Sequence, residues 1–247
     1  WYWPLLAFAI LLIALGEAWP AEAYCQEQPW YACVRDVELL RPGAYDYSPS
    51  VLHDGQVWRA FWCGLSVDGT GDAIWTSWSA DRIFGWSAPV QVLTGAPFGA
   101  QHACDPSVIY RAGGWPTAGG WPWLMAVNFA NGDTGNRVAL AVSMDGVTWT
   151  PTGVQLSYAL PGCQAPTGYG CGQFSMVHVA GRFYATFVRS GSGDDGTFAA
   201  SSADGLTYYQ DAKIDALTSA PDVMYDPVTG WWLLVRSTAT GVDLGHA

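Results

Sequence analysis

The quartet SPSV at residues 48–51 opens a unit that the chain repeats, and this repetition decides the fold. Related quartets stand at 105–108 (DPSV), 173–176 (QFSM) and 220–223 (APDV), so successive copies begin 57, 68 and 47 residues apart. Each quartet is followed by a turn and an aromatic-rich segment. Internal repeats of about 40–60 residues built from short strands predict an all-β fold, a β-propeller. Because the first strands of propeller blades converge on the axis, we expect the functional residues there.

Runs of β-branched and aromatic residues bounded by Gly, Asn, Asp and Pro predict the individual strands. No stretch after residue 45 has a sustained helical period. The fourth copy ends without outer strands, so we expect about three and a half blades over residues 46–247 of a five-bladed propeller that is incomplete at its C-terminus. The expected strands are 48–52, 57–63, 73–78 and 90–93; 107–110, 123–129, 138–143 and one from 149; 175–179, 183–189, 197–201 and one from 208; and 223–225 and 231–236.

The first 45 residues are expected to lie outside the propeller. Residues 5–15 form an apolar run that is short for a membrane span, and an Ala-x-Ala pattern follows at 21–23. We interpret residues 1–23 as a signal peptide clipped at its N-terminus, with a buried helix or an anchor as alternatives, and residues 24–45 as an N-terminal extension. This predicts a secreted protein, extracellular or periplasmic, with no stable membrane span after cleavage.

Six cysteines agree with export to an oxidising compartment. The pairs Cys25/Cys33 and Cys163/Cys171 share a spacing of eight, which suits small loop-closing bridges and leaves Cys63 with Cys104. Fifteen pairings are possible in principle. Cys63 ends a second strand and Cys104 precedes the next first strand, so this pair is expected at one end of the blades.

Composition bounds the ligand. The formal net charge is −11 and Lys213 is the only lysine, which does not suit nucleic acid, whose phosphates demand clustered Lys and Arg. Few lysines with 15 Trp and 12 Tyr favour a neutral ligand bound by stacking, for which carbohydrate is the usual case. Most of the aromatic residues are expected to pack between blades. We expect a monomer.

Two near-identical stretches, SMDGVTW at 143–149 and SADGLTY at 202–208, have the chemistry of a turn. Asp accepts from backbone N–H groups, Gly supplies a positive φ, and the aromatic residue packs over the hairpin. They resemble the Asp-boxes of sialidases and related propellers, which lie on the face opposite the active site. We assign them a structural role.

The inner strands carry the candidate catalytic residues. Residues two apart on a strand share a face. Asp105 opens its quartet, Asp46 lies two residues before Ser48, and Asp222 lies two residues after Ala220. We therefore expect Asp46, Asp105 and Asp222 to point together into the axial channel. His102, three residues before Asp105, lies on the face of the propeller where the inner strands begin and is a candidate for orienting a substrate. Under a pure binding function, aromatic platforms such as Trp62 would dominate this pocket.

The blade openings SPSVLHDG at 48–55 and DPSV at 105–108 resemble those of the five-bladed glycosidases, namely glycoside hydrolase families 43 and 32 and the arabinanase, levansucrase and invertase superfamily. The resemblance covers residues 45–237 and implies glycoside hydrolysis of a plant or microbial polysaccharide or oligosaccharide. It implies that Asp46 is the base or nucleophile and Asp105 the tuning or stabilising acid.

That family places its general acid, a Glu, on the third blade, where this chain has Gln173. All four glutamates precede the first blade. Asp194, Asp195 or Asp222 are possible substitutes, and a non-catalytic carbohydrate-binding or cell-surface propeller is the simpler alternative. A sialidase-like enzyme is a further alternative that would need an arginine triad.

Arg189 and Arg236 occupy matching places at the ends of second strands, and there paired guanidinium groups suit a carboxylate or sulfate on an acidic sugar. They suit equally the neutralisation of the axial aspartates. His53 and His178 fall near turns on the far side and are expected to be structural. The sequence shows no metal-binding constellation, nucleotide loop or Ser-His-Asp arrangement, so no cofactor is expected.

Overall fold

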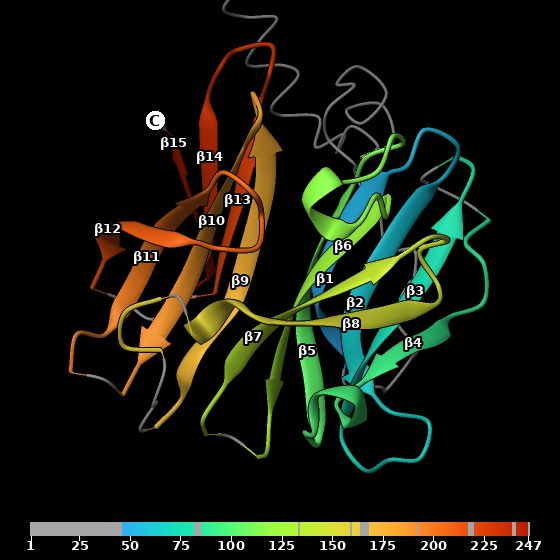
Figure 1. Cartoon of the computed structure of the whole chain (residues 1–247), viewed down its shortest axis with the longest axis horizontal. Helices are drawn as coiled ribbons and strands as arrows, with labels where there is room; N and C mark the ends of the chain where they lie inside the picture. Colours follow the sequence, from blue (N-terminus) through green and yellow to red (C-terminus); the bar gives the residue numbers. More distant parts are fainter. Residues whose placement is uncertain are drawn as a thin grey trace, which may run out of the picture.

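The computed structural model describes residues 46–81, 85–132, 134–158, 160–163, 168–191, 193–216, 220–238 and 241–246, except for some side chains, including that of Arg236. The predicted signal peptide and extension, with Cys25 and Cys33, lie outside this part of the chain. Within it, four antiparallel sheets follow one another in chain order, the all-β propeller arrangement that the repeats predict (Figure 1).

Each sheet is a meander in which neighbouring strands are consecutive in the chain. The sheets are β1 (Asp46–His53), β2 (Trp58–Leu65), β3 (Asp72–Ser79) and β4 (Val90–Thr94); β5 (His102–Tyr110), β6 (Trp123–Ala130), β7 (Arg137–Ser143) and β8 (Trp149–Gln155); β9 (Gly170–Val179), β10 (Arg182–Ser190), β11 (Gly196–Ser202) and β12 (Tyr209–Asp215); and β13 (Pro221–Tyr225), β14 (Trp232–Thr238) and β15 (Gly241–His246).

The fourth sheet corrects one prediction. The sequence suggested no strand after residue 236, but β15 pairs with β14 from Leu233↔His246 to Thr238↔Gly241. Its sequence, GVDLGH, is short and contains two glycines, so it lacks the β-branched and aromatic run by which the other strands are recognised. Pairing with the apolar β14 makes it a strand.

Helix is scarce in the described residues. It is limited to three short 3-10 turns, η1 (Ala96–Phe98), η2 (Pro116–Ala118) and η3 (Leu156–Tyr158), as expected from a chain without helical periodicity. Over the same residues, no helix has the length and apolar character required to cross a membrane.

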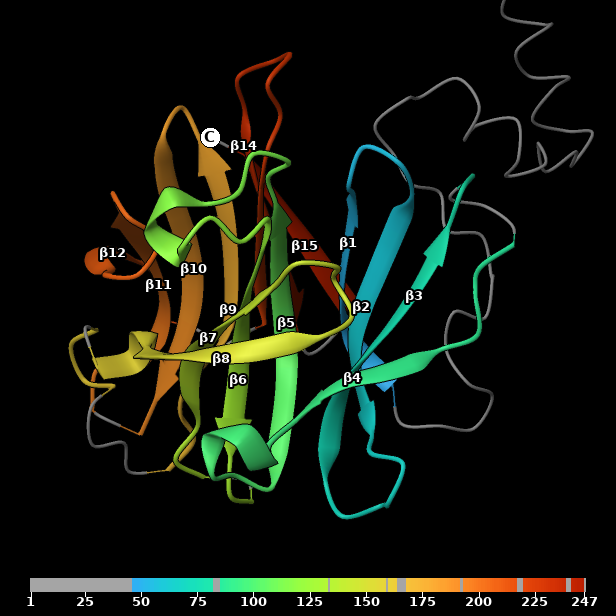
Figure 2. The same ribbon diagram turned by 45° about the vertical axis from the view of Figure 1, so that its right-hand side comes forward.

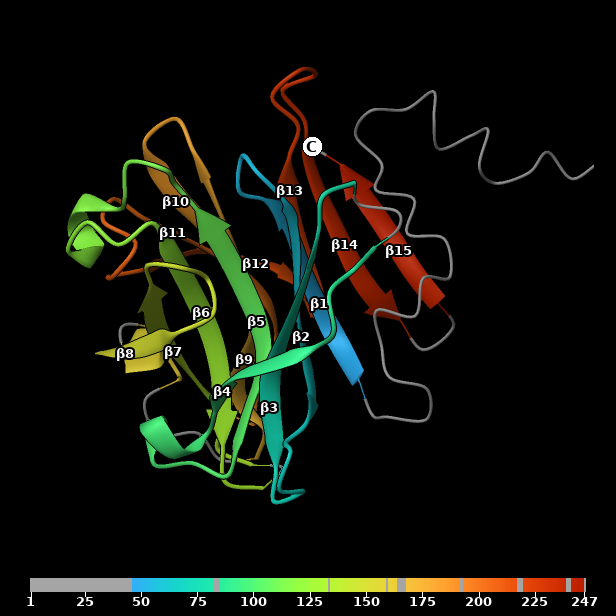
Figure 3. The same cartoon turned by 90° about the vertical axis from the view of Figure 1, so that its right-hand side faces the viewer.

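The inner strands β1, β5, β9 and β13 are neighbours in that order (Figures 2 and 3). Three of them carry a bulge at the first residue of the repeated quartet: Ser48, Asp105 and Gln173 have φ values of 51°, 47° and 51°. The ladder register shifts at each of these places. A bulge inserts one extra residue and turns the side chains that precede it to the other face of the strand.

The serine at the third position of the first three quartets joins neighbouring blades. The Oγ atoms of Ser50, Ser107 and Ser175 accept hydrogen bonds from backbone N–H groups of the following inner strand, those of Val108 (3.1 Å), Met176 (2.9 Å) and Val223 (3.1 Å). An inner strand pairs with its own blade along one edge only. The serines therefore accept from N–H groups on the other edge of the following inner strand, which faces the preceding blade. This explains why the first three quartets share a serine, whereas the fourth has Asp222 in that place.

We expect Ser107→Ala to lower the free energy of unfolding by about 1–3 kcal/mol, because the Met176 N–H is buried and would lose its acceptor. Ser50→Ala should cost less, since its bond to Val108 is partly exposed. Urea unfolding of the two variants tests this. Equal stability of Ser107→Ala and wild type would show that the inter-blade bond contributes nothing.

Apolar side chains fill the spaces between blades. Phe61, Met125 and Trp149 belong to a cluster between the first two sheets, and Leu124 and Phe174 belong to one between the second and third. The two sets come from opposite faces of the sheets, which explains the nearly continuous apolar sequence of β6.

The Ser-x-Asp-Gly stretches form the expected turns. Asp145 Oδ1 accepts from the N–H groups of Val147 (2.8 Å) and Thr148 (2.7 Å), and Gly146 has a φ of 74°. Partial burial alone would raise the pKa of Asp145, but these bonds and the hydroxyls of Ser143 and Thr148 outweigh it and lower the pKa to about 2. The turn therefore holds a charged aspartate at any ordinary pH.

Two disulfides hold the described part of the chain together. Cys63 and Cys104 join β2 to β5 with a Cα–Cα distance of 4.9 Å, and Cys163 pairs with Cys171 at 5.5 Å. The Cys163–Cys171 pairing was predicted from spacing and the Cys63–Cys104 pairing as the one that remained, and both are confirmed. The first bridge links two blades at the end where the inner strands begin.

Candidate functional site

A cavity of about 590 Å³ opens where the inner strands begin. It is lined from all four blades, and its walls are formed mainly by hydroxyl, amide, carboxyl and aromatic groups. Of the residues singled out from the sequence, His102, Asp105 and Gln173 line it. The other lining residues are Tyr47, Ser48, Pro49, Asp72, Cys104, Asn128, Phe129, Ala130, Gly132, Asn136, Tyr169 and Ala220.

Asp105 lies at the bulge of β5, which turns its carboxyl group into the cavity. Its Oδ1 accepts from Ser48 Oγ at 2.6 Å and its Oδ2 from Asn128 Nδ2 at 3.2 Å. Burial raises the pKa of Asp105, and the negative charge of Asp72 raises it further, while the two hydrogen bonds offset part of the effect. Asp105 therefore holds a proton more readily than an ordinary aspartate.

An amide network supports this carboxyl group. Asn128 Nδ2 also donates to Asn136 Oδ1 at 3.0 Å, and Asn136 Nδ2 donates to the Tyr169 carbonyl at 2.9 Å. Burial and the charge of Asp105 raise the pKa of Tyr169, which keeps its hydroxyl protonated. A Cβ atom at Gly172 would lie 2.7 Å from the Asn128 amide and from the Tyr169 hydroxyl, so the network requires glycine there.

Sequence reasoning missed this network, although one signal was present. Asn128 is the only polar side chain in the otherwise apolar β6 sequence WLMAVNFA, and it is buried. A buried amide within such a strand needs partners, which places it at a polar site.

Asp72 and His102 form a second ionisable pair in the cavity. Asp72 begins β3 of the first blade and His102 begins β5 of the second, and Asp72 Oδ2 lies 3.0 Å from His102 Nδ1. The Asp72 N–H also points at this nitrogen, at 3.2 Å, and the Tyr47 hydroxyl lies 3.5 Å from Oδ2. Sequence reasoning found His102 but missed Asp72, because Asp72 begins β3, the third strand of its blade, and the search for carboxylates was based on the inner strands.

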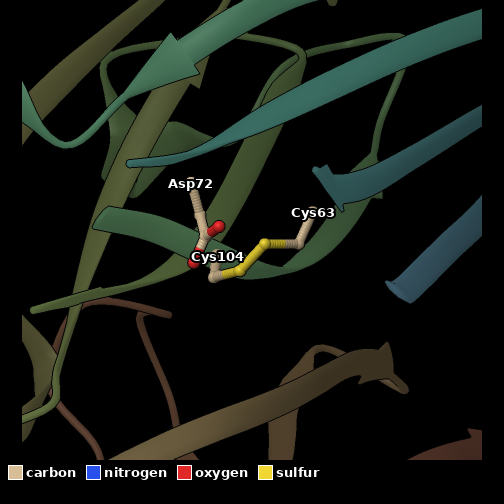
Figure 4. Close-up of side chains that lie close together, drawn as sticks. All are labelled: Cys63, Asp72 and Cys104. Carbon is tan, nitrogen blue, oxygen red and sulfur yellow. A yellow bond between two sulfur atoms is a disulfide. The ribbon is translucent and has the colours of Figure 1, made fainter. Parts of the chain in front are cut away.

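The Asp72 carboxylate also lies beside the Cys63–Cys104 disulfide (Figure 4). Ligand atoms of these three residues lie within 4.8 Å of one another. Metal ions bind thiolates, however, and the two sulfur atoms here are joined to each other. This group is therefore a structural bridge beside the cavity.

Asp46, predicted at the axis, does not line the cavity. Its Oδ1 accepts from Trp62 Nε1 at 3.2 Å, and a Cβ atom at Gly64 would meet this oxygen. The bulge at Ser48 breaks the two-residue parity on which the prediction depended, so Ser48 takes the position that corresponds to Asp105. Trp62 is 1% exposed, so it cannot serve as a stacking platform.

Asp222 also lies outside the cavity lining. It occupies the position that Ser50, Ser107 and Ser175 hold in the other blades, and its Oδ1 accepts from Ser175 Oγ at 2.5 Å. The prediction placed Asp222 at the cavity because it is two residues after Ala220. Of these two residues, only Ala220 lines the cavity.

Arg189, predicted at the rim, is buried within the third blade. It donates to Asp194, to the Pro161 carbonyl and to Gln210, and its guanidinium lies 4.0 Å from the centre of the Phe198 ring. Its donors are thus used inside the blade. The side chain of the other predicted arginine, Arg236, lies outside the described part of the structure.

The three matched bulge positions therefore carry Ser48, Asp105 and Gln173, of which only Asp105 is ionisable. Gln173 makes no side-chain hydrogen bond within the described part of the chain, so its amide is available to a ligand.

We expect the raised pKa of Asp105 to appear as pH-dependent stability. Below about pH 4 the carboxyl is protonated in both folded and unfolded chains, and its burial carries no charge penalty. As the pH rises through the folded-state pKa, the penalty grows. Asp105→Asn removes it, so the free energy of unfolding of the variant should increase relative to that of wild type as the pH rises above about 4. Urea unfolding at several pH values measures this gain, and a constant difference would contradict it.

No protein-family profile matches the chain, and no curated protein matches it. Solved structures do. Superposition on the Hadza microbial sialidase Hz136 gives a TM-score of 0.60 at 14% identity, covering 82% of this chain and 44% of that one. The endo-arabinase from Bacteroides thetaiotaomicron VPI-5482 gives 0.59 at 13% identity, covering 81% and 74%. Zg3597, a family 117 glycoside hydrolase of Zobellia galactanivorans, gives 0.59 at 12%, covering 83% and 66%.

These comparisons confirm the fold class. The chain has the β-propeller fold and is similar in structure to the endo-arabinase and to the family 117 glycoside hydrolase. It spans less than half the length of the sialidase. At 12–14% identity, the similarity between this chain and these structures concerns the fold alone.

Proposed function

We propose that this propeller binds carbohydrate in the axial cavity and hydrolyses a glycosidic bond there. One observation carries the proposal: two carboxyl groups, Asp105 and Asp72, lie in the same cavity in different environments. Asp105 is buried, which raises its pKa, whereas Asp72 faces an imidazole. Glycoside hydrolysis needs one group that protonates the leaving oxygen and another that acts on the opposite side of the sugar.

The rest of the lining supports a neutral sugar. Hydroxyl and amide groups from Tyr47, Ser48, Asn136 and Gln173 can exchange hydrogen bonds with sugar hydroxyls. No Lys or Arg occurs among the described residues of the lining, so a carboxylated or sulfated sugar would find no counter-charge in this part of the chain. The substrate class we propose is a neutral plant or microbial polysaccharide or oligosaccharide.

Release of reducing sugar from arabinan, levan, xylan and mannan, together with neutral 4-nitrophenyl glycosides, tests this proposal. We expect turnover of at least one neutral substrate and none of a 4-nitrophenyl sialoside. Asp226→Asn, in an exposed turn between β13 and β14, is the matched control and should behave as wild type. Absence of hydrolysis with every substrate would contradict an enzymatic function.

A non-catalytic carbohydrate-binding propeller is the second candidate, and Ser48 and Gln173 favour it, because two of the three matched positions carry no acid. Calorimetric titration with the same oligosaccharides separates the two. A binder would show affinity without turnover, and Asp105→Asn would leave that affinity largely intact.

We also propose that the protein is exported, acting in an extracellular or periplasmic space. The two disulfides of the described residues support this, because such bonds persist in oxidising compartments. The signal peptide over residues 1–23 and the number of five blades stay predictions.

A further inference from the structure

We infer that the Asp72–His102 pair is the proton acceptor of this site, with His102 Nε2 taking a proton from the water that attacks the anomeric carbon. The inference rests on the proposed hydrolysis and assigns its base. The base then comes from the junction of β3 and β5, and not from a carboxylate on the inner strand β1.

The two side chains are held from neighbouring blades. The adjacent Gln101 donates from Nε2 to the Thr70 carbonyl at 2.8 Å and from its backbone N–H to Asn131 Oδ1 at 2.9 Å. These bonds tie the loop before Asp72 to the loop that follows β6. The side chains of His102 and Asp72 are 27% and 18% exposed, so both are partly desolvated while water still reaches them.

The hydrogen bonds at Nδ1 determine which ring nitrogen is free. Nδ1 lies close to both the Asp72 carboxylate and the Asp72 N–H. A bond to an ionised acceptor is roughly twice as strong as one between neutral groups, so Nδ1 carries the proton and donates it to Oδ2. In the described structure no group hydrogen-bonds to Nε2, which leaves its lone pair available as a base.

The ionisable groups around the imidazole come from several strands. Asp72 from β3 and Asp105 from β5 are the carboxyl groups of the cavity, and Tyr47 from β1 also lines it. Burial raises the pKa of Tyr169, before β9, so its phenol is neutral. No Lys or Arg occurs among the lining residues that are described. An imidazolium formed at His102 is therefore stabilised by the carboxylate at Nδ1, as in other carboxylate–histidine pairs.

The hydrolytic step balances with these groups alone. Water oxygen forms a bond to the anomeric carbon, and its proton passes to His102 Nε2. The bond from the anomeric carbon to the leaving oxygen breaks, its electron pair stays on that oxygen, and the oxygen takes the proton of the Asp105 carboxyl group. Solvent then carries a proton from His102 back to Asp105. Because water attacks directly, the anomeric configuration is inverted.

Two substitutions of His102 separate a base from a positioning residue. His102→Asn keeps an N–H donor near the Nδ1 position for Asp72 but has nothing at Nε2, whereas His102→Gln places an amide near Nε2. We expect both to lower kcat by about 10²–10⁴-fold with little change in KM, since this is the usual contribution of general acid–base catalysis. Asp72→Asn should lower kcat by at least about 10-fold through the loss of the partner. His53→Asn, at the far end of β1, is the control.

A readout independent of turnover accompanies the kinetics. The ¹⁵N shifts of the neutral His102 ring should report a proton on Nδ1 in wild type and a shift toward Nε2–H in Asp72→Asn. Proton NMR of the first product should show inversion. Full activity of His102→Asn, or retention of configuration, overturns the inference while leaving the proposed hydrolysis intact. No hydrolysis by wild type overturns both.

Discussion

Replacing Asp105 by Asn is expected to reduce hydrolysis by about 10³–10⁴-fold, close to the limit of detection, because the amide has no proton to give to the leaving oxygen. The side chain keeps its shape, and Ser48 Oγ can still donate to the remaining oxygen. The loss should therefore fall on kcat, and affinity for product oligosaccharides should change little. Initial rates on the best substrate, together with calorimetric titration, measure the two quantities.

The same assay applied to Asp46→Asn and Asp222→Asn tests whether these two aspartates are catalytic, as residue spacing along the strands suggested, or lie outside the site, as the cavity lining indicates. Neither side chain lines the cavity, so both variants should retain activity within about a factor of three, a range typical of residues remote from the reacting atoms. Asp226→Asn again provides the baseline. Loss of activity in Asp46→Asn with normal activity in Asp105→Asn would restore the inner strand β1 as the source of the base and overturn the acid role of Asp105.

Removing the Cys63–Cys104 disulfide with two alanines should lower the free energy of unfolding by about 4 kcal/mol, the loop-closure value for a separation of 41 residues. The Cys163/Cys171 double variant is the matched comparison. Its separation of eight residues predicts about 2.5 kcal/mol. The longer loop matters more because the bridge removes more conformational freedom from the unfolded chain.

Urea unfolding of both double variants checks this order. We also expect the Cys63/Cys104 variant to lose activity more than the other, because Cys104 precedes Asp105 and the bridge lies against Asp72. An equal or reversed order of stabilities would show that native-state packing, and not loop closure, dominates the contribution of these bonds.

Much of the fold was readable from local sequence. Strands built from β-branched and aromatic runs, the Ser-x-Asp-Gly turns and the four quartets follow from backbone preferences and from side-chain periodicity, which act over a few residues. Both disulfides of the described residues were inferred from spacing and strand position. The strand β15 was missed because its glycine-containing sequence has little strand preference and depends on β14 for its hydrogen bonds.

The sequence by itself determined that this protein is an all-β propeller and predicted a site where the inner strands begin. Of the residues that it named, His102, Asp105 and Gln173 line the cavity there. Tertiary structure alone decided the remaining members. The bulge at Ser48 removes Asp46 from the cavity, since one extra residue reverses the side-chain alternation on which parity depends. Asp72 reaches the site because the first two blades pack side by side, and Asn128 reaches it because β6 pairs with β5, contacts that no spacing along the chain encodes.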